Sequence, residues 1–402
     1  MRILHTSDWH LGRSFHSVGM LGAQAAYVDH LLDVVESEQV DLVVVSGDVY
    51  DRALPPVDAV DLADDTFARL AASRADVVVS SGNHDSPARL GFNARLADAA
   101  GVHLRTRWQD IGAPVLLHDA HGEVAVYGIP YLEPDAVRSA WDLPERSHAS
   151  ALTAAMGRVR ADLSSRPGAR SVVLAHAFVA GGPDAARAMA CESERDISVG
   201  GIQITPTETF SEVSYAALGH LHGRQTLTET IRYSGSPLAY SFSESGHTKG
   251  SWLVDLGADG VQAVEFVAAP VPRRLATLRG RIDDLIHDPR HADVEDAWLQ
   301  VILTDPRRPL HAMDRLRARF PHTLMIAFQP EGVTARRGPV VPHVDGRSDL
   351  DIALGFVAEV RELEATTEEE LLLQLACDSC RMSEDRDADF RGSAPVPEGE
   401  VG

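Results

Sequence analysis

Cysteine is scarce in this 402-residue sequence, which contains only Cys191, Cys377 and Cys380. So few cysteines, in an odd number, exclude the disulfide framework of compact secreted proteins and fit a reducing cytoplasm. Cys377 and Cys380 have the spacing of half a tetrahedral thiolate site, but nothing else in the C-terminal tail completes it. We therefore interpret this pair as packing or chance and predict no zinc site there.

Long apolar runs are missing as well. No stretch of about 18 apolar residues occurs, so we predict no membrane span. The first residues, MRILHTSDWH, lack the apolar segment of a secretory signal. The remaining composition, 44% hydrophobic and 24% charged, is ordinary for a globular protein that buries a sizeable core. We expect a cytoplasmic protein of two or three domains.

Positive charge is in short supply. Lys249 is the only lysine, and the formal net charge is −22, which at first sight speaks against a nucleic-acid partner. The charge is uneven, however: residues 271–340 carry a net +3, whereas residues 341–402 carry −11. Divalent ions neutralise the carboxylates that surround them, so a metal site would give part of the negative charge a function.

What the sequence does contain is an alternation of strand-like and helix-like segments over residues 1–270. Short apolar runs suit strands buried on both faces, and Ala-rich amphipathic segments at 22–38, 57–74 and 148–163 suit helices. The pattern predicts an α/β fold with helices layered on sheet. The expected strands are RILHTSD, DLVVVSGD, DVVVSSGN, EVAVYGIP, SVVLAHAF, SYAALGHLH and IRYSGSP.

The pattern of apolar and polar residues changes near residue 270. A second unit is expected over 271–335, with helical patches at 279–287 and 310–319 and strands at 298–304 and 323–328. Residues 336–348 follow as a linker, and 349–383 as a helical segment. Its first helix has an apolar stripe, and Thr366 or Thr367 can cap a second helix with an acidic first turn. The polar, Pro- and Gly-rich residues 384–402 are expected to be disordered. The stripe consists of Leu350, Ile352, Leu354, Val357, Val360 and Leu363.

Side chains that can bind metal ions follow five of the expected strands. Partners two residues apart in extended chain point the same way, and strand ends at one sheet edge converge, so these groups can meet in one cleft. Carboxylate, imidazole and amide without thiolate suit manganese, iron or zinc. Two neighbouring ions need a bridging ligand, and Asp48 is the candidate. The predicted metal ligands are Asp8, His10, Asp48, Asn83, His176, His220 and His222.

Each of these pieces has an ordinary structural explanation when it is taken alone. GDVYD can be a turn with a helix-capping aspartate, and His176 in an apolar strand can be a satisfied core histidine. Ligands in order at five strand ends are not explained in this way. A metal site therefore remains the better interpretation of the set.

The order D-x-H, G-D-x-x-D, G-N-H-D, H and G-H-x-H is similar to that of the calcineurin-like metallophosphoesterases. Within these, the chain resembles the bacterial SbcD nuclease subunits through residue 383, the tail alone being unmatched. This resemblance implies two central β-sheets flanked by helices, a small capping domain over 271–335 and a C-terminal helical segment. The segments that carry it are MRILHTSDWHLGRSF, LAHAFVAGG, SERDISVGG, ALGHLHGRQ, RYSGSPLAYSFSE and VPRRLATLRG.

The resemblance also implies a ligand set. One ion is held by Asp8, His10, Asp48 and His222, and the second by Asp48, Asn83, His176 and His220. Manganese is the first expectation, with magnesium, iron or zinc as alternatives. A water between the two ions attacks the DNA phosphorus.

Two further residues of the GNHD motif are expected to be catalytic. His84 contacts the scissile phosphate and stabilises or protonates the leaving oxygen. Asp85 either orients His84 or closes a turn. Asp51 departs from some archaeal relatives, which place a histidine there, and its role stays open.

DNA and a protein partner also follow from the resemblance. The capping domain seats duplex DNA, with Arg273, Arg274, Arg279 and Arg281 as the best basic cluster and Arg307 with Arg308 as a second; surface arginines without a ligand are the alternative. The partner is the SbcC ATPase, which the helical segment contacts in a heterotetramer of two SbcC and two SbcD chains, the latter as a homodimer. Docking of these helices on the chain's own domain is the alternative.

Three functions remain in competition. The first is a nucleoid-associated, ATP-regulated DNA nuclease for repair, replication and recombination. It acts as a 3′–5′ exonuclease on duplex ends and as an endonuclease on single strands and hairpins. The second is another phosphoesterase, such as a protein phosphatase or a cyclic-nucleotide phosphodiesterase, which has no use for a capping unit and partner helices. The third is a scaffold with a degenerate site, which the complete set of ligands disfavours.

Overall fold

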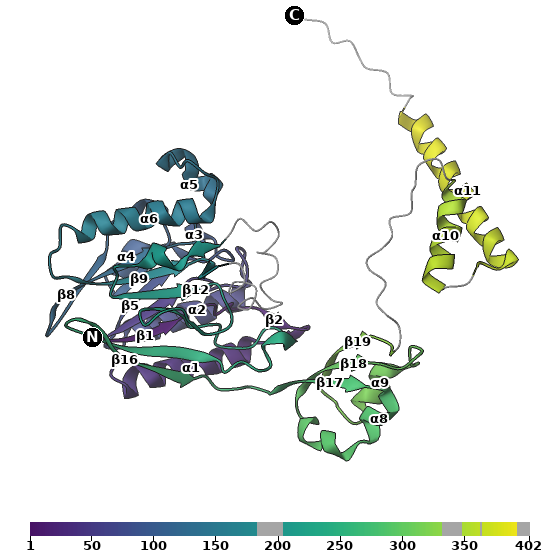
Figure 1. The fold of residues 1–402 in the computed structure, drawn as a ribbon, viewed down its shortest axis with the longest axis horizontal. Coiled ribbons are helices and arrows are strands. Elements are labelled where there is room, and N and C mark those ends of the chain that lie inside the picture. The colour runs from purple at the N-terminus through teal and green to yellow at the C-terminus, as the bar shows by residue number, and fades with distance from the viewer. Residues whose placement is uncertain (183–203, 332–347, 362–363, 392–402) are drawn as a thin grey trace, which may run out of the picture. The chain divides into compact units, whose positions relative to one another are not determined.

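The structure, a computed structural model, describes residues 1–182, 204–331, 348–361 and 364–391. The chain divides into two compact units, Met1–Glu331 and Gly332–Gly402 (Figure 1). Among the described helices, none has the length and apolar character needed to cross a bilayer.

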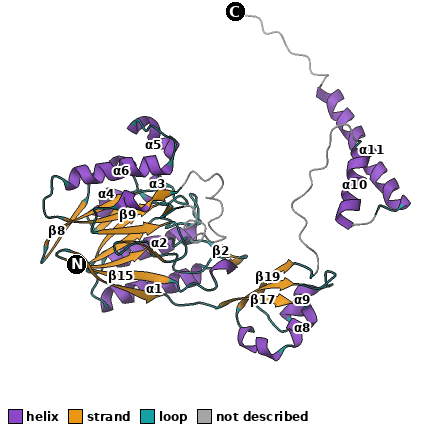
Figure 2. Ribbon diagram, in the orientation of Figure 1, coloured by secondary structure: helices purple, strands orange, loops and turns teal. Residues whose placement is uncertain are grey.

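Two six-stranded sheets form the body of the first unit (Figure 2). All seven expected strands are present, as β1, β4, β5, β8, β9, β12 and β14. The first sheet has the order β16 (Gly260–Ala268), β15 (Gly250–Gly257), β1 (Arg2–Thr6), β4 (Leu42–Ser46), β5 (Asp76–Ser80) and β6 (Val102–Arg105). The second has the order β13 (Gln225–Thr226), β14 (Ile231–Tyr233), β12 (Tyr215–Gly219), β9 (Arg170–His176), β8 (Gly122–Ile129) and β7 (Val115–Asp119).

Helices pack on the outer face of each sheet. The predicted helices at 22–38, 57–74 and 148–163 are confirmed as α1 (Leu21–Ser37), α2 (Val57–Ala71) and α6 (His148–Leu163). The smaller elements are α3 (Pro87–Leu90), α4 (Ala94–Asp98), α5 (Pro134–Trp141) and the two-residue strands β2 (Ser14–Phe15), β3 (Val18–Gly19), β10 (Val179–Ala180) and β11 (Thr205–Pro206).

Alternate residues of the central strands enter different layers. In β4, Leu42 and Val44 pack between the two sheets, whereas Val43 and Val45 pack with residues of α1 and α2. β9 alternates in the same way between the inter-sheet layer and the layer under α6. Burial on both faces explains why these strands read as continuous apolar runs. The predicted α/β fold, two sheets flanked by helices, is confirmed.

The direction of the central strands positions the functional site. β1, β4 and β5 run parallel in one sheet, and β8, β9 and β12 run parallel in the other. The carboxyl ends of parallel strands lie at one edge, which is where ligands bind in open α/β sheets. The predicted metal ligands all follow such ends.

A small α/β region completes the first unit. Its parallel sheet, in the order β17 (Leu275–Gly280), β18 (Trp298–Leu303) and β19 (Thr323–Phe328), packs with α8 (Ile282–His287) and α9 (Ala312–Arg317) around its own core. The strands predicted at 298–304 and 323–328 are confirmed. The helix predicted from residue 279 is wrong in its first residues, because Arg279 and Gly280 belong to β17 and pair with β18.

The second unit contains α10 (Asp349–Arg361) and α11 (Thr367–Arg391). Thr366 is the residue that caps α11: its Oγ1 accepts from the Glu369 amide at 3.3 Å, and its own amide donates to the Glu369 carboxylate at 3.0 Å. α11 continues past residue 383, where the expected disordered tail begins, because EDRDADFR contains neither Gly nor Pro. Residues 392–402 and nearly all of the expected linker, 336–348, lie outside the described residues.

Candidate metal centre

The predicted ligands lie where the two sheets end. Asp8 and His10 follow β1, Asp48 follows β4, and Asn83 follows β5. The other three end β9 or follow β12. Asn83 is exposed and marks the open side of the centre, whereas the remaining six are buried, with at most 4% of their surface accessible: Asp8, His10, Asp48, His176, His220 and His222.

Unusual backbone turns aim these side chains inward. Asp8, His10 and Asp48 all have left-handed φ angles, of 55°, 46° and 50°. Such angles are uncommon outside glycine and cost free energy, so they persist where the surroundings impose them, which is often at functional sites. The regular pleat of the strand is therefore interrupted at each of these residues.

Two glycines make room for this arrangement. A Cβ atom on Gly82 would lie 2.0 Å from Oδ1 of Asp48, and one on Gly47, whose φ is +82°, would lie 2.3 Å from Nδ1 of His176. Neither position tolerates a side chain without displacing a ligand. Close approach thus requires both glycines, and the positive φ of Gly47 is a second requirement at that position.

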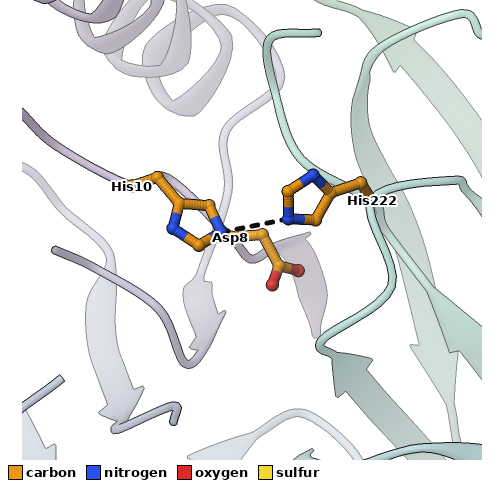
Figure 3. Close-up of side chains that lie close together, drawn as sticks. All are labelled: Asp8, His10 and His222. Carbon is orange, nitrogen blue, oxygen red and sulfur yellow. Dashed lines mark hydrogen bonds between the residues drawn. The ribbon is translucent and has the colours of Figure 1, made fainter. Parts of the chain in front are cut away.

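The first group of ligands consists of Asp8, His10 and His222. Their ligand atoms lie within 4.8 Å of one another. Nε2 of His10 is 3.1 Å from Nε2 of His222, and Figure 3 shows the two rings facing each other with the Asp8 carboxylate beside them. The carboxylate is held in place by the Ser7 hydroxyl and by the His220 amide, which donates at 3.1 Å.

The second group consists of Asn83, His176 and His220. Oδ1 of Asn83 is 2.9 Å from Nε2 of His176 and 3.1 Å from Nδ1 of His220, and these two ring nitrogens are 3.2 Å apart. Nδ1 of His176 points away, to the backbone carbonyl of Ser46 at 2.9 Å. That contact fixes the ring and leaves Nε2 directed into the centre.

Asp48 lies between the two groups. Its Oδ2 is 3.3 Å from Nε2 of His176 and 3.7 Å from Nε2 of His10. Burial alone would raise the pKa of the Asp48 carboxyl, but His176 and His10 outweigh burial and hold that pKa well below its usual range. An anion shared by both groups is what a bridging ligand requires.

The protonation states of the histidines fit a metal site. Burial holds the pKa values of His10 and His220 well below the usual range, so both rings are neutral and have a lone pair to offer. Burial would also lower the pKa of His176, but the facing Asp48 carboxylate raises it to about 9. His176 would therefore have to release a proton for its Nε2 to serve as a metal ligand at neutral pH.

The donor set fits divalent metal ions. It comprises four imidazoles, two carboxylates and one amide oxygen, with no thiolate. Such mixed N and O sets suit first-row divalent ions. The structure thus supports a divalent metal centre at these residues.

His84 lies beside the centre, on its open side. Its Nδ1 is 2.7 Å from the Asp51 carbonyl oxygen, and its amide donates to Oδ1 of Asp48 at 2.9 Å. The carbonyl accepts the Nδ1 proton, which leaves Nε2 free. His84, His10 and Asp48 also present ligand atoms within 4.8 Å of one another. His84 can therefore reach a substrate or a metal ion, and the two roles need separate tests.

Asp85 does not orient His84 through a hydrogen bond within the described structure. Its carboxylate instead accepts from three backbone amides, those of Val49 at 3.1 Å, Tyr50 at 2.9 Å and Gly82 at 2.9 Å. Burial and the nearby Asp48 carboxylate raise the pKa of Asp85 to about 6, against the effect of these amides. Asp85 thus joins the loop after β4 to the loop after β5, which corresponds to the turn-closing alternative.

Asp51 makes contacts that the sequence did not reveal. Its carboxylate is 3.7 Å from Nε of Arg13 and 3.5 Å from a guanidinium nitrogen of Arg52. It is also 3.8 Å from Nδ1 of His10. These two arginines offset the charge of Asp51, so an aspartate is compatible with a phosphate-binding cleft.

Two residues beside the centre were missed in the sequence. Glu244 and Lys249 are 1% and 8% exposed and form a buried ion pair next to His222. Burial alone would raise the pKa of Glu244, but Lys249 and His222 hold it well below the usual range. The one available signal was that Lys249 is the only lysine of the chain.

The four predicted DNA-binding arginines all have partners within the small α/β region. Arg274 donates to the Asp293 carbonyl at 3.0 Å and Arg281 to the Glu331 carboxylate at 3.0 Å. Arg279 donates to the Gln329 side chain at 2.6 Å, and Arg273 donates to the Asp296 carbonyl. Arg273 and Arg279 therefore bond to uncharged acceptors and keep their positive charge available.

Comparison with protein families gives two matches. Residues 1–223, more than half of the chain, match the calcineurin-like phosphoesterase model, so the chain belongs to this family of metal-dependent hydrolases. Residues 271–372 match the SbcD C-terminal model, which is described as a Type 5 capsule protein repressor C-terminal domain. Together the two matches mark an SbcD-type protein.

Solved structures resemble the chain only distantly. The crystal structure of TT1561 from Thermus thermophilus aligns with a TM-score of 0.40 and 13% identity, covering 66% of this chain and 98% of that one. A β-glucosidase from Exiguobacterium marinum aligns with a TM-score of 0.20 and 9% identity, covering 82% and 89%. At such low scores neither alignment bears on function.

Proposed function

We propose that this protein is a two-metal DNA nuclease subunit that works with an SbcC-type ATPase. The observation that carries the proposal is the position of Asp48 between two groups of ligands, in a chain whose C-terminal part matches SbcD. One ion is assigned to Asp8, His10, Asp48 and His222, and the other to Asp48, Asn83, His176 and His220. Manganese is the proposed metal.

The proposed chemistry divides the work between ions and side chains. When bound, the two ions supply Lewis-acid chemistry, in which they neutralise phosphate oxygens and lower the pKa of an attacking water. Asp48 holds the two ligand groups together. His84, fixed through Nδ1 by the Asp51 carbonyl, presents Nε2 to the leaving oxygen and, when both ring nitrogens carry a proton, stabilises or protonates it. Asp85 acts as a positioning residue that keeps the loops after β4 and β5 in register.

The substrate is tested with purified chain in manganese. The assay compares an end-labelled DNA duplex, a single strand, a hairpin and bis-p-nitrophenyl phosphate, with and without SbcC and ATP. We expect cleavage of DNA that SbcC and ATP extend into long duplex in the 3′–5′ direction. Hydrolysis of the small diester without cleavage of any DNA would favour a small-molecule phosphodiesterase instead.

DNA contact is proposed for the small α/β region between residues 271 and 335. Arg273 and Arg279 support it best, because their hydrogen bonds go to uncharged groups. Arg274 and Arg281 lie close to carboxylates, which reduces the charge they offer to phosphate. The acidic balance of the whole chain is consistent with weak DNA binding until the partner adds its own contacts.

The helices of the second unit are proposed to bind SbcC. Within this unit, the stripe residues of α10 are half-buried where their side chains are described, whereas four other apolar side chains remain between 58% and 65% exposed. Apolar helix faces of this kind are typical of helix-in-groove recognition. The four exposed residues are Phe356, Leu371, Leu372 and Leu375.

Deleting residues 345–402 is expected to separate DNA cleavage from SbcC binding. The truncated chain should retain manganese-dependent cleavage of short DNA, since the metal centre lies in the first unit, but it should no longer co-purify with SbcC. Leu371→Glu with Leu375→Glu should give the same loss without truncation. A truncated chain that still binds SbcC would place the interface elsewhere.

Homodimerisation is proposed through α2 and the turn between α3 and α4. Val57 and Phe92 are 76% and 74% exposed, and Val60 and Phe92 line the same hollow next to Tyr50. A second copy is proposed as the occupant of this apolar surface, since two such surfaces can cover each other about a two-fold axis.

Phe92→Glu is expected to weaken the dimer by about 100-fold or more, as a buried aromatic anchor does when it is replaced by a charge. Sedimentation equilibrium measures this change. Leu116→Glu, which alters an exposed apolar residue on β7, is the matched control and should leave the dimer intact. Equal sedimentation of the Phe92 variant and the wild type would rule out this interface.

A further inference from the structure

The strongest unassigned feature of the molecule is the buried pair of Glu244 and Lys249 beside His222. Nζ of Lys249 donates to the Glu244 carboxylate, to the His222 carbonyl at 2.7 Å and to the Ser236 hydroxyl at 3.0 Å. A lysine ammonium has three hydrogens to donate, so all three are used. Two of the three acceptors thus tie Lys249 directly to the backbone of His222 and to the carboxylate next to its ring.

The Glu244 carboxylate faces the His222 ring. Its Oε1 is 3.5 Å from Nδ1 of His222, and the Tyr240 amide donates to the same oxygen at 3.3 Å. The opposite ring nitrogen, Nε2, points at His10 in the metal centre. Glu244 therefore contacts the side of the imidazole that faces away from the ligand group.

A pair of this kind is poorly explained by fold stability. Removing two charges from water is costly, and a buried ion pair often contributes no more than apolar side chains of similar volume. A carboxylate behind a metal-binding imidazole has a direct use, because it fixes the tautomer with hydrogen on the outer nitrogen and increases the basicity of the inner one.

Two other imidazole ligands are supported differently on their outer nitrogens. Nδ1 of His176 faces a backbone carbonyl, and Nδ1 of His10 lies 3.8 Å from the nearest carboxylate oxygen of Asp51, beyond hydrogen-bond range. Among the described contacts of these three outer nitrogens, only that of His222 brings a carboxylate within 3.5 Å. His222, a ligand assigned to one ion, thus has a carboxylate behind its ring. His176, a ligand assigned to the other ion, has an uncharged carbonyl in that place.

We propose that Glu244, held by Lys249, is the positioning residue for His222 and selectively sets the affinity of the ion bound by Asp8, His10 and His222. This inference rests on the proposed two-metal site. It predicts unequal effects on the two ions: loss of the carboxylate weakens the first and leaves the second, at His176 and His220, in place.

The test counts manganese ions per chain by equilibrium dialysis and follows the Mn²⁺ electron paramagnetic resonance spectrum. Glu244→Gln should weaken one ion by about 10- to 100-fold and leave the other unchanged. At manganese concentrations that fill both sites of the wild type, the variant should hold one ion, and the spectrum should change from a coupled pair to an isolated ion.

The double variant Glu244→Gln with Lys249→Met separates positioning from folding. It removes both buried charges, so its thermal midpoint should return towards that of the wild type, while the first ion should stay weakly bound. Recovery of both stability and ion affinity in the double variant would reduce the pair to a structural role and overturn the proposal.

The matched control is Asp119→Asn, which breaks another largely buried ion pair, with Arg170, on the second sheet. It should lower the thermal midpoint without changing either ion. Two ions of unchanged affinity in Glu244→Gln would overturn this inference alone. A wild-type chain that never holds a second ion would overturn the two-metal assignment itself.

Discussion

Asp48→Ala is expected to abolish DNA cleavage, with a loss of about 10⁴-fold or more, because activation of water and charge neutralisation by paired ions are lost together. The structural reason is the position of the Asp48 carboxylate, 3.3 Å from His176 and 3.7 Å from His10, between the two groups. The measurement is initial cleavage of an end-labelled duplex in manganese at enzyme excess.

Asp48→Ala should also change metal binding. Without the shared anion, ions bound in neighbouring groups repel each other, so the variant should hold no more than one manganese per chain. Asp65→Ala, an exposed carboxylate on α2 that pairs with Arg69, is the control and should behave as the wild type. Appreciable cleavage by the Asp48 variant would contradict the bridging role.

His84→Gln is expected to lower DNA cleavage by about 10²- to 10⁴-fold, the usual contribution of a general acid, while the chain still binds two ions. The prediction follows from the Nδ1 contact with the Asp51 carbonyl, which directs Nε2 to the open side of the centre, where a ring protonated on both nitrogens can donate. Cleavage rate and manganese content are measured on the same preparation.

A second substrate distinguishes the roles open to His84. Nitrophenolate leaves without help from an acid, so bis-p-nitrophenyl phosphate should lose only a small part of its rate in the variant. An equal loss with both substrates would argue that His84 binds the phosphate without aiding the leaving oxygen. Loss of an ion would show that His84 is a ligand, as its distance to His10 and Asp48 permits.

The sequence was sufficient for the layers of the fold, and the seven ligands that it predicts lie close together in the structure. Strands buried on both faces have a clear signature, and ligands that follow consecutive parallel strands must meet at one edge. Arg279 and Gly280, which end β17, were predicted as the start of a helix, and the strand itself was not predicted. The parallel pairing with β18 makes this segment a strand, and that pairing is a non-local contact.

The surroundings of the centre could not be predicted from the sequence. Asp85 stands next to His84 along the chain, which suggested that they interact, yet its carboxylate points to the amides of Val49, Tyr50 and Gly82. Glu244 is more than 20 residues from His222 and carries no motif of its own. Contacts of this kind depend on how loops close over the sheet edge.

The most direct test of the two-metal account is a crystal structure of the chain soaked in manganese, with anomalous scattering used to locate the ions. The account predicts two peaks that share Asp48, one contacted by Asp8, His10 and His222 and the other by Asn83, His176 and His220. A single peak, or an ion bound by His84 in place of one of these ligands, would contradict it.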